Sequence, residues 1–152
     1  IYPKANSTRI SPAAPQTDEI KKAANLVFKA RHPVIIAGSA VHNAKAYKEL
    51  EELATLLSIP VATSYRGKSA FAETNPLALG MMGTFGQKAA NDLIASADVL
   101  LVAGCRLSPS DIKTEERWLI NPSRQKIIQI DIEPRNIGWV VPVGLILTVL
   151  SL

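Results

Sequence analysis

The sequence predicts an α/β fold of three layers, in which a parallel sheet of about six strands is covered by helices on both faces. Two apolar runs, residues 34–37 and 99–103, contain no polar alternation, which is typical of parallel strands that are buried on both faces. Segments with the period of an amphipathic helix alternate with such runs, as they do in right-handed βαβ units. A chain of 152 residues, 47% of them hydrophobic, is long and apolar enough to bury one core.

The first 16 residues contain three prolines and are predicted to be a linker. We expect the first helix to begin with Thr17 as its cap and to end before Pro33, which cannot continue a helix. The folded domain is therefore predicted to span residues 17–147. The apolar face of this first helix is expected to carry Ile20, Ala24 and Val27.

Two further helices and a long loop are expected in the middle of the chain. The second helix is predicted between Asn43, as its cap, and Pro60, and a short strand follows at residues 61–63. Residues 64–86 are rich in glycine and are predicted to form one long loop, which in a compact domain usually has a function. A third helix is expected over residues 87–95.

The last third of the chain is expected to hold a short helix at residues 115–120 and two more strands. One strand is predicted at residues 127–130, ending at Asp131, and the last at residues 143–147. Residues 148–152 are expected to be a truncated tail. We therefore expect the chain to be a fragment of a longer protein.

Charge and composition exclude several classes of function. The net charge is +4, but the 17 basic residues are scattered and aromatic residues make up only 5%, so no nucleic-acid-binding surface is expected. One cysteine and two histidines exclude a disulfide framework and a zinc cluster, and they favour a reducing cytoplasm. The uncharged residues 137–152 are fewer than the roughly 20 of a membrane-spanning helix. We expect a cytoplasmic protein that binds neither nucleic acid nor a membrane.

The candidate binding residues follow the predicted strands. In open parallel sheets, ligands bind beyond the carboxyl ends of the strands, where the loops converge. Glycine lets the backbone approach a phosphate, arginine matches phosphate oxygens, and a carboxylate accepts hydrogen bonds from ribose. These rules predict a nucleotide-binding site, although glycines at such places also form ordinary turns. The candidate residues are Gly38, Ser39, Ala40, Thr63, Ser64, Gly83, Gly104, Arg106 and Asp131.

Familiar catalytic patterns are absent from the sequence. It contains no GxGxxG dinucleotide fingerprint, no P-loop and no GxSxG nucleophile elbow. Cys105 follows a predicted buried strand and is expected to be an inert core residue. We therefore expect no catalytic residue and no metal ligand in this chain.

Several segments, taken in order, resemble one family. They include Pro33-Val34-Ile35-Ile36-Ala37-Gly38-Ser39-Ala40, Gly80-Met81-Met82-Gly83, Gly104-Cys105-Arg106-Leu107 and Ile128-Gln129-Ile130-Asp131-Ile132-Glu133-Pro134. The resemblance is to the central domain of thiamine-diphosphate-dependent enzymes, in the group of acetolactate synthase, benzoylformate decarboxylase and oxalyl-CoA decarboxylase, and it covers residues 17–147. It implies a Rossmann-like sheet of six parallel strands that holds FAD in some members, ADP or coenzyme A in others, and nothing in many.

The same resemblance implies roles for two residues. Arg106 would contact the phosphate or adenosine part of a nucleotide, and Asp131 its ribose or adenine. The glutamate that activates thiamine diphosphate belongs to the first domain of family members, and the motif that binds its diphosphate through a metal belongs to the third. Where acetolactate synthases carry Arg-Phe-Asp-Asp-Arg, this chain reads Arg106-Leu107-Ser108-Pro109-Ser110, which lacks the two acids and the second arginine.

Sequence and resemblance together predict the central domain, structural and nucleotide-binding, of a thiamine-diphosphate-dependent enzyme that acts on 2-oxo acids. Its parent would be an acetolactate synthase-like lyase or transferase and a homo-oligomer. Thiamine diphosphate and magnesium would be bound by the parent's other domains, so this chain is expected to be inactive alone. Two alternatives stay open: a free-standing nucleotide-binding module, and an interaction domain with a vestigial cleft.

Overall fold

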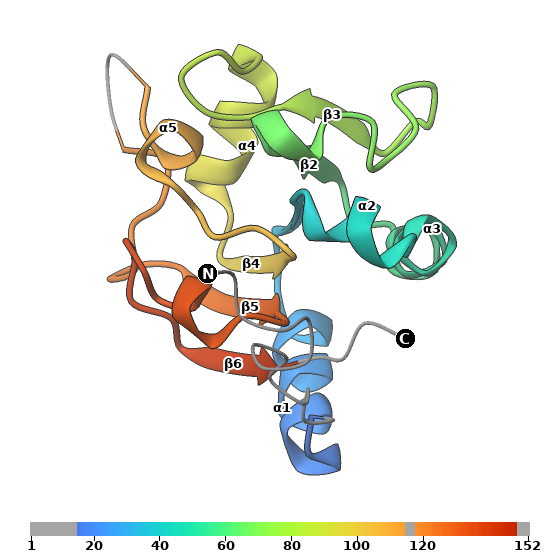
Figure 1. Ribbon diagram of the computed structural model, residues 1–152, viewed down its shortest axis with the longest axis vertical. Helices are drawn as coiled ribbons and strands as arrows, with labels where there is room; N and C mark the ends of the chain where they lie inside the picture. The colour runs from blue at the N-terminus through green and yellow to red at the C-terminus, as the bar shows by residue number, and fades with distance from the viewer. Residues whose placement is uncertain (1–14, 115–117, 149–152) are drawn as a thin grey trace, which may run out of the picture.

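Six parallel strands form one sheet in the computed structural model, which describes residues 15–114 and 118–148. The strands are β1 (Pro33–Ala37), β2 (Val61–Thr63), β3 (Ala78–Met81), β4 (Val99–Ala103), β5 (Lys126–Asp131) and β6 (Leu145–Thr148). They lie in the order β3-β2-β1-β4-β5-β6, and every neighbouring pair is parallel (Figure 1). The predicted parallel sheet of about six strands is confirmed.

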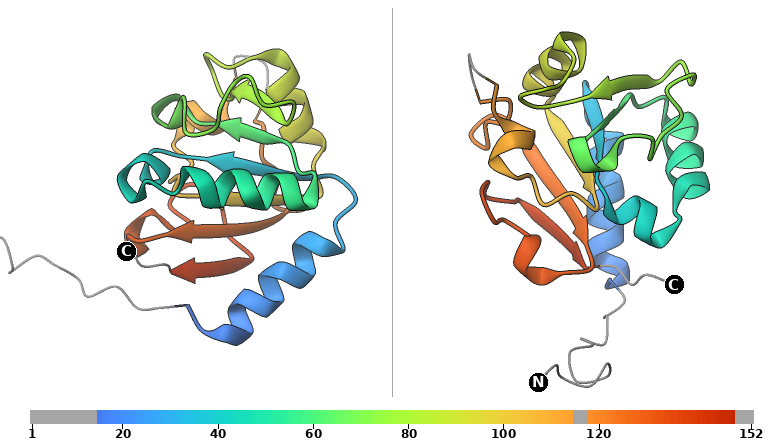
Figure 2. Two further views of the ribbon diagram at one scale, coloured as in Figure 1. Left: turned by 90° about the vertical axis from the view of Figure 1, so that its right-hand side faces the viewer. Right: turned by 45° about the horizontal axis from the view of Figure 1, so that its top comes forward.

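Helices cover both faces of this sheet and complete the three layers. They are α1 (Thr17–Phe28), α2 (Ala40–Ala44), α3 (Tyr47–Leu57), α4 (Lys88–Ser96) and α5 (Pro109–Ile112), with 3₁₀ turns η1 (Tyr65–Gly67) and η2 (Pro134–Asn136). The first three helices pack on one face, and α4 and α5 on the other (Figure 2). None of the described helices is both long enough and apolar enough to cross a membrane.

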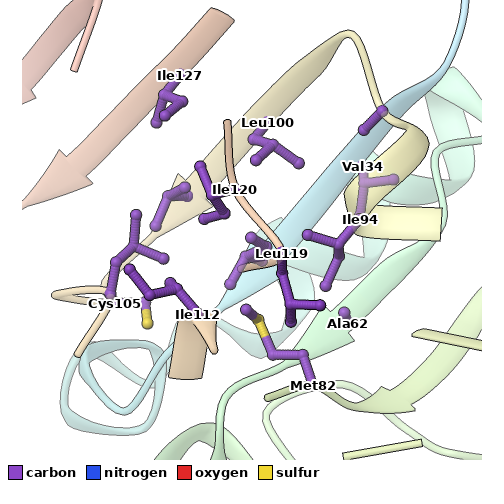
Figure 3. Packing of buried hydrophobic residues seen from close by; sticks show 14 of the residues in the cluster. Val34, Ala62, Met82, Ile94, Leu100, Cys105, Ile112, Leu119, Ile120 and Ile127 are labelled. Carbon is purple, nitrogen blue, oxygen red and sulfur yellow. The ribbon is translucent and has the colours of Figure 1, made fainter. Parts of the chain in front are cut away.

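Successive side chains of the two central strands point to opposite faces, and both faces are buried. Ile36 of β1 packs with Leu100 and Val102 of β4 on the side of α4, in the cluster that Figure 3 shows. Ile35 and Leu101 pack on the other side, against α1 and α3. Because helices cover both faces, these strands have no solvent-facing side, which explains why their sequences do not alternate.

The structure contains an edge strand that sequence reasoning missed. Residues 64–86, predicted to form one loop, hold both the turn η1 and the strand β3. Gly80 has a φ of +80°, and the register between β2 and β3 shifts at Val61 and Ala62, which marks a bulge. Glycine inside a strand weakens it, so we attribute the formation of β3 to its pairing with β2.

The helix predicted at residues 115–120 is wrong where it can be compared with the structure. Residues 118–120 are not helical, and residues 115–117 lie outside the described part. A one-turn helix, α5, occurs earlier instead. Pro109 occupies its first turn, and Asp111 and Ser108 cap it, which is a standard way to begin a helix.

The buried face of α1 is narrower than predicted. Val27 is buried as expected, together with Ala23, but Ile20 and Ala24 are exposed. Thr17 is the first helical residue rather than the cap, and Gln16 in the cap position makes no capping hydrogen bond through its side chain. Packing against β4 and β6 needs only one stripe of α1, so the rest of its surface faces solvent.

Two other boundaries differ from the prediction. Asn43 lies inside the separate short helix α2 rather than capping the next helix, and Ala46 precedes α3. The break between α2 and α3 falls at Lys45, whose left-handed φ of 54° ends α2. The last strand starts two residues later than predicted and ends at Thr148, and residues 149–152 of the expected tail lie outside the described residues.

The carboxylate of Asp98 joins two loops at the amino edge of the sheet. Its oxygens accept hydrogen bonds from the backbone N–H groups of Arg31 at 2.8 Å and His32 at 2.9 Å. Burial by itself raises the pKa of this carboxyl, but the backbone N–H donors outweigh it and leave the pKa below its ordinary 3.8. The ionised carboxylate therefore fastens the start of β1 to the start of β4.

A charge in the central strand should prevent folding. Leu101 is 7% exposed, so Leu101→Asp would bury an unpaired carboxylate and should cost more than about 4 kcal/mol of stability. Leu56→Asp, at an 80% exposed position of α3, is the matched control and should change stability by about 0.5 kcal/mol or less. Circular dichroism and urea unfolding measure both. A well-folded Leu101→Asp protein would contradict the doubly covered sheet.

Removing the charge of Asp98 should destabilise the fold in a pH-dependent way. Asp98→Asn should lower the free energy of unfolding by about 1 kcal/mol at neutral pH. Because the folded pKa is lowered, this stabilisation is present above the ordinary pKa of 3.8 and is lost as the pH falls through the folded value. Urea unfolding at neutral and acidic pH measures it, with the exposed ion-pair variant Glu52→Gln as control. An equal effect at both pH values would contradict this account.

Candidate functional site

The strand order places a crevice at the carboxyl edge of the sheet between β1 and β4. The chain continues from β1 to β2 and β3 on one side, and from β4 to β5 and β6 on the other. Ligands of open α/β sheets bind where the strand order reverses in this way. A cavity of about 330 Å³ lies there, lined by residues of the loops that follow β1, β2, β4 and β5.

Backbone segments in direct contact build the base of this crevice. A Cβ atom on Gly38 would overlap the carbonyl oxygen of Gly104 and lie 2.5 Å from the Cα of Cys105. Gly67, after β2, lies so near that a Cβ there would be 2.9 Å from the Cα of Gly38. Gly104 also has a left-handed φ of +60°. These loops can meet only because glycine stands at all three positions.

Hydrogen bonds hold the loops in that contact and use up one backbone donor. The Gly38 N–H donates to the carbonyl of Ala103 at 2.8 Å, and the Ala40 N–H donates to the carbonyl of Gly104 at 3.1 Å. In dinucleotide-binding folds the first N–H groups of the helix after β1 contact phosphate. Here the N–H of Ala40 is already bonded to Gly104 and is not available to a phosphate in the cavity.

Two of the residues that line the cavity are arginines, and they lie in loops that follow different strands. Arg106 follows β4, and its guanidinium lies 5.2 Å from the ring centroid of Trp139. Arg66 lies in η1 after β2. Neither arginine forms an ion pair with another residue of the described chain. Both charges can therefore pair with an anion in the cavity.

Two buried carboxylates also line the cavity, and each is held by its own loop. Asp131, 4% exposed, accepts hydrogen bonds from the Glu133 N–H at 2.9 Å and the Asn136 side chain at 3.2 Å. Asp111 accepts from the backbone N–H of Ser108 at 3.0 Å and from its hydroxyl. Within residues 15–114 and 118–148, no group of three or more acids, histidines or cysteines is placed to hold a metal ion.

Two buried residues support the cavity without offering reactive groups: Cys105 lines it, and Gln129 lies behind its wall. The Gln129 amide donates to the carbonyls of Cys105 at 2.9 Å and Asn136 at 3.2 Å, which ties the loop after β4 to the loop after β5. Burial raises the pKa of the Cys105 thiol to about 12, and the charge of Asp111 adds to the rise. The thiol therefore stays protonated at neutral pH, in agreement with its interpretation as an inert residue.

The structure brings most of the candidate residues together. Gly38 lies in the base of the crevice, and Thr63 ends β2 without lining the cavity. Gly83 lies outside it, where its N–H donates to the Asn91 side chain at 2.8 Å and its backbone packs on α5. That these residues bind a cofactor stays a prediction. The candidates that line the cavity are Ser39, Ala40, Ser64, Gly104, Arg106 and Asp131.

Several lining residues lie a few positions beyond the predicted ones. Arg66 comes two residues after Ser64, and Asn43 comes three residues after Ala40. Both would have been found if the search for binding residues beyond the carboxyl ends of the strands had included the whole first turn of each loop. Asp111 gave no such signal, because it reaches the cavity only through the fold of α5.

Comparison with known sequences identifies similar proteins. The family model described as "Thiamine pyrophosphate enzyme, central domain" matches residues 20–149. The "Probable acetolactate synthase large subunit" of Methanocaldococcus jannaschii is 47% identical over 120 residues, which are 79% of this chain and 20% of that protein. The sulfoacetaldehyde acetyltransferase of Rhodobacter capsulatus is 40% identical over 134 residues, which are 87% of this chain and 22% of that protein.

A solved structure shares the fold. It is the X-ray structure of an enzyme isolated from Mycobacterium smegmatis and assigned to the thiamin diphosphate-dependent class. The TM-score is 0.74, and the match covers 97% of this chain and 28% of that one. The sequences are 23% identical, so this likeness concerns the fold alone. The chain spans about a fifth of the length of the curated relatives it matches.

A side chain at Gly38 should disrupt the base of the crevice. Gly38→Ala would force the loops after β1 and β4 apart and should lower the free energy of unfolding by about 3 kcal/mol. Gly144→Ala is the matched control, because a Cβ there would meet its nearest neighbour, the Ile127 carbonyl oxygen, at an ordinary 3.7 Å. Urea unfolding compares the two. Equal stability of both variants would contradict the close contact.

Proposed function

Because this chain belongs to the family of central domains of thiamine pyrophosphate enzymes, we propose that it is the structural, nucleotide-binding domain of an acetolactate synthase-like enzyme that acts on 2-oxo acids. The family agrees with the resemblance seen in the sequence. The names of the relatives, acetolactate synthase and sulfoacetaldehyde acetyltransferase, support a parent of the transferase or lyase class. The activity is assigned to that parent, since this chain spans about a fifth of such proteins.

The observation that carries the nucleotide proposal is the cavity that joins Arg106 and Asp131. Arg106 lies in the loop after β4, and Asp131 is the last residue of the adjacent strand β5. A guanidinium matches phosphate oxygens, and a carboxylate accepts hydrogen bonds from ribose hydroxyls. This arrangement suits the ADP group, which ADP, FAD and coenzyme A share. A volume of about 330 Å³ lies within the usual range for sites that bind small molecules.

An aromatic pair beside the cavity favours a ligand with a second flat ring. Tyr65 lines the cavity, and its ring centroid lies 6.4 Å from that of Phe85. Both rings are largely exposed, so a flat ligand group could stack on them. Among the three nucleotides, this feature favours FAD, whose flavin could stack there.

Thiamine diphosphate, when bound by the parent enzyme, supplies carbanion chemistry on a 2-oxo acid. The described residues do not fit its magnesium-diphosphate group, because no group of three or more acids, histidines or cysteines among them is placed to hold a metal ion. We therefore place thiamine diphosphate and magnesium in the other domains of the parent. The part of this chain is to hold a nucleotide and to orient the loops around it.

We also propose partners and a compartment. The partners are the other domains of the parent chain and further copies of that chain in a homo-oligomer. The single cysteine, Cys105, is a free and buried thiol, which suits the reducing cytoplasm. An interaction domain with a vestigial cleft would bind no nucleotide, so a nucleotide titration distinguishes it from this proposal.

Isothermal titration calorimetry of the 152-residue chain tests the proposed function. We expect saturable binding of ADP or FAD and none of thiamine diphosphate with Mg²⁺. Arg106→Ala should weaken nucleotide binding about ten- to a hundredfold, because a charge-assisted hydrogen bond contributes about 1.5–3 kcal/mol. Arg124→Ala removes the same charge just before β5, at the opposite edge of the sheet, and is the control. Absence of nucleotide binding, or saturable binding of thiamine diphosphate, would contradict the proposal.

A further inference from the structure

We propose that Arg66 binds a second phosphate group in the cavity, so that the site selects a nucleoside diphosphate over a monophosphate. This inference rests on the proposed nucleotide-binding function and names its ligand class. Arg66 lines the same cavity as Arg106. Because Arg66 follows β2 and Arg106 follows β4, the two guanidinium groups come from loops on either side of β1.

The backbone that carries Arg66 is fixed beside the cavity. Arg66 lies in η1, in which the N–H of Gly67 donates to the hydroxyl oxygen of Ser64 at 3.1 Å. The Gly67 backbone in turn contacts Gly38 so closely that no side chain fits between them. The arginine side chain therefore starts from a defined position next to the loop after β1.

No neighbour in the described part of the chain neutralises the charge of Arg66. Within residues 15–114 and 118–148, its guanidinium forms no ion pair and no hydrogen bond. Lys68, two residues further on, differs, because its Nζ lies 2.7 Å from a carboxylate oxygen of Glu73. An unpaired guanidinium that lines a cavity can form a bidentate contact with a phosphate.

The order of groups along the sheet edge matches the order of groups along a nucleoside diphosphate. The strand order β5-β4-β1-β2 places Asp131, Arg106, Ser39 and Arg66 in that sequence. Neighbouring strands lie about 4.8 Å apart, so β4 and β2 are separated by roughly 10 Å. With the ribose at Asp131, we expect Arg106 to contact the α-phosphate and Arg66 the adjacent β-phosphate; the long arginine side chains, reaching toward each other over Ser39, span the gap between β4 and β2.

A monophosphate would leave Arg66 without a partner. A bidentate contact with Arg106 engages one phosphate group, and the nearby backbone donor of Ala40 is already bonded to Gly104. ADP therefore gains a charge-assisted contact that AMP lacks. This contact should favour ADP over AMP by about ten- to a hundredfold.

Calorimetric titration of the 152-residue chain with ADP and AMP separates the two arginines. Arg66→Gln should weaken ADP binding about ten- to a hundredfold and leave AMP binding unchanged, whereas Arg106→Gln should weaken both. Arg66→Lys keeps the charge but loses the planar fork, so it should recover part of the ADP affinity. Arg124→Gln is the matched control and should change neither. Circular dichroism checks that each variant is folded.

The outcomes distinguish this proposal from the function on which it rests. Equal effects of Arg66→Gln on ADP and AMP, or no effect on either, would overturn the role of Arg66, while losses in Arg106→Gln would leave the nucleotide site standing. A wild-type chain that binds none of ADP, AMP, FAD and coenzyme A would overturn both. FAD and coenzyme A carry the same diphosphate. If either binds the wild-type chain, Arg66→Gln should weaken its binding by the same factor as it weakens the binding of ADP.

Discussion

Direct contact between the backbones of three loops is the constraint on which the rest of the site depends. Gly38 lies against the carbonyl of Gly104, and Gly67 lies against Gly38, with no side chain between them. The strand order reverses between β1 and β4, so the loops leave these strands in opposite directions. Their contact closes the base of the crevice, and the backbone N–H of Ala40 there donates its hydrogen bond to the carbonyl of Gly104. The cavity above this base is lined by residues of the loops that follow β1, β2, β4 and β5.

The doubly covered sheet holds those loops in place. Apolar side chains pack on both faces of β1 and β4, and Asp98 joins the starts of the same two strands at the opposite edge. Gln129, buried in β5, braces the loop after β4 against the loop after its own strand. Arg106 and Asp131 therefore extend from a rigid frame, which is what a preorganised binding site needs.

The fold could be predicted because its strongest signals are local, whereas parts of the site could not. The run Val99–Ala103 indicates a central parallel strand by itself, but β3 contains Gly80 and forms only through its pairing with β2. Arg106 was found because the search after β4 extended over Gly104 and Cys105 to the third residue, whereas the search after β2 stopped at Ser64, one residue past that strand. Arg66 is also the third residue after its strand and would have been found by reading that loop equally far, but its approach to the loop after β1 depends on the close contact of Gly67 with Gly38, which no local signal shows. Gly83 was named although it packs on α5.

A crystal structure of the chain with ADP tests the central claim most directly. The account predicts electron density for the diphosphate above the loop after β1, with the guanidinium of Arg106 on the α-phosphate and that of Arg66 on the β-phosphate. A ribose hydroxyl should lie within hydrogen-bond distance of the Asp131 carboxylate. ADP bound away from the carboxyl edge between β1 and β4, or a crevice that stays empty at saturating ADP, would contradict the account.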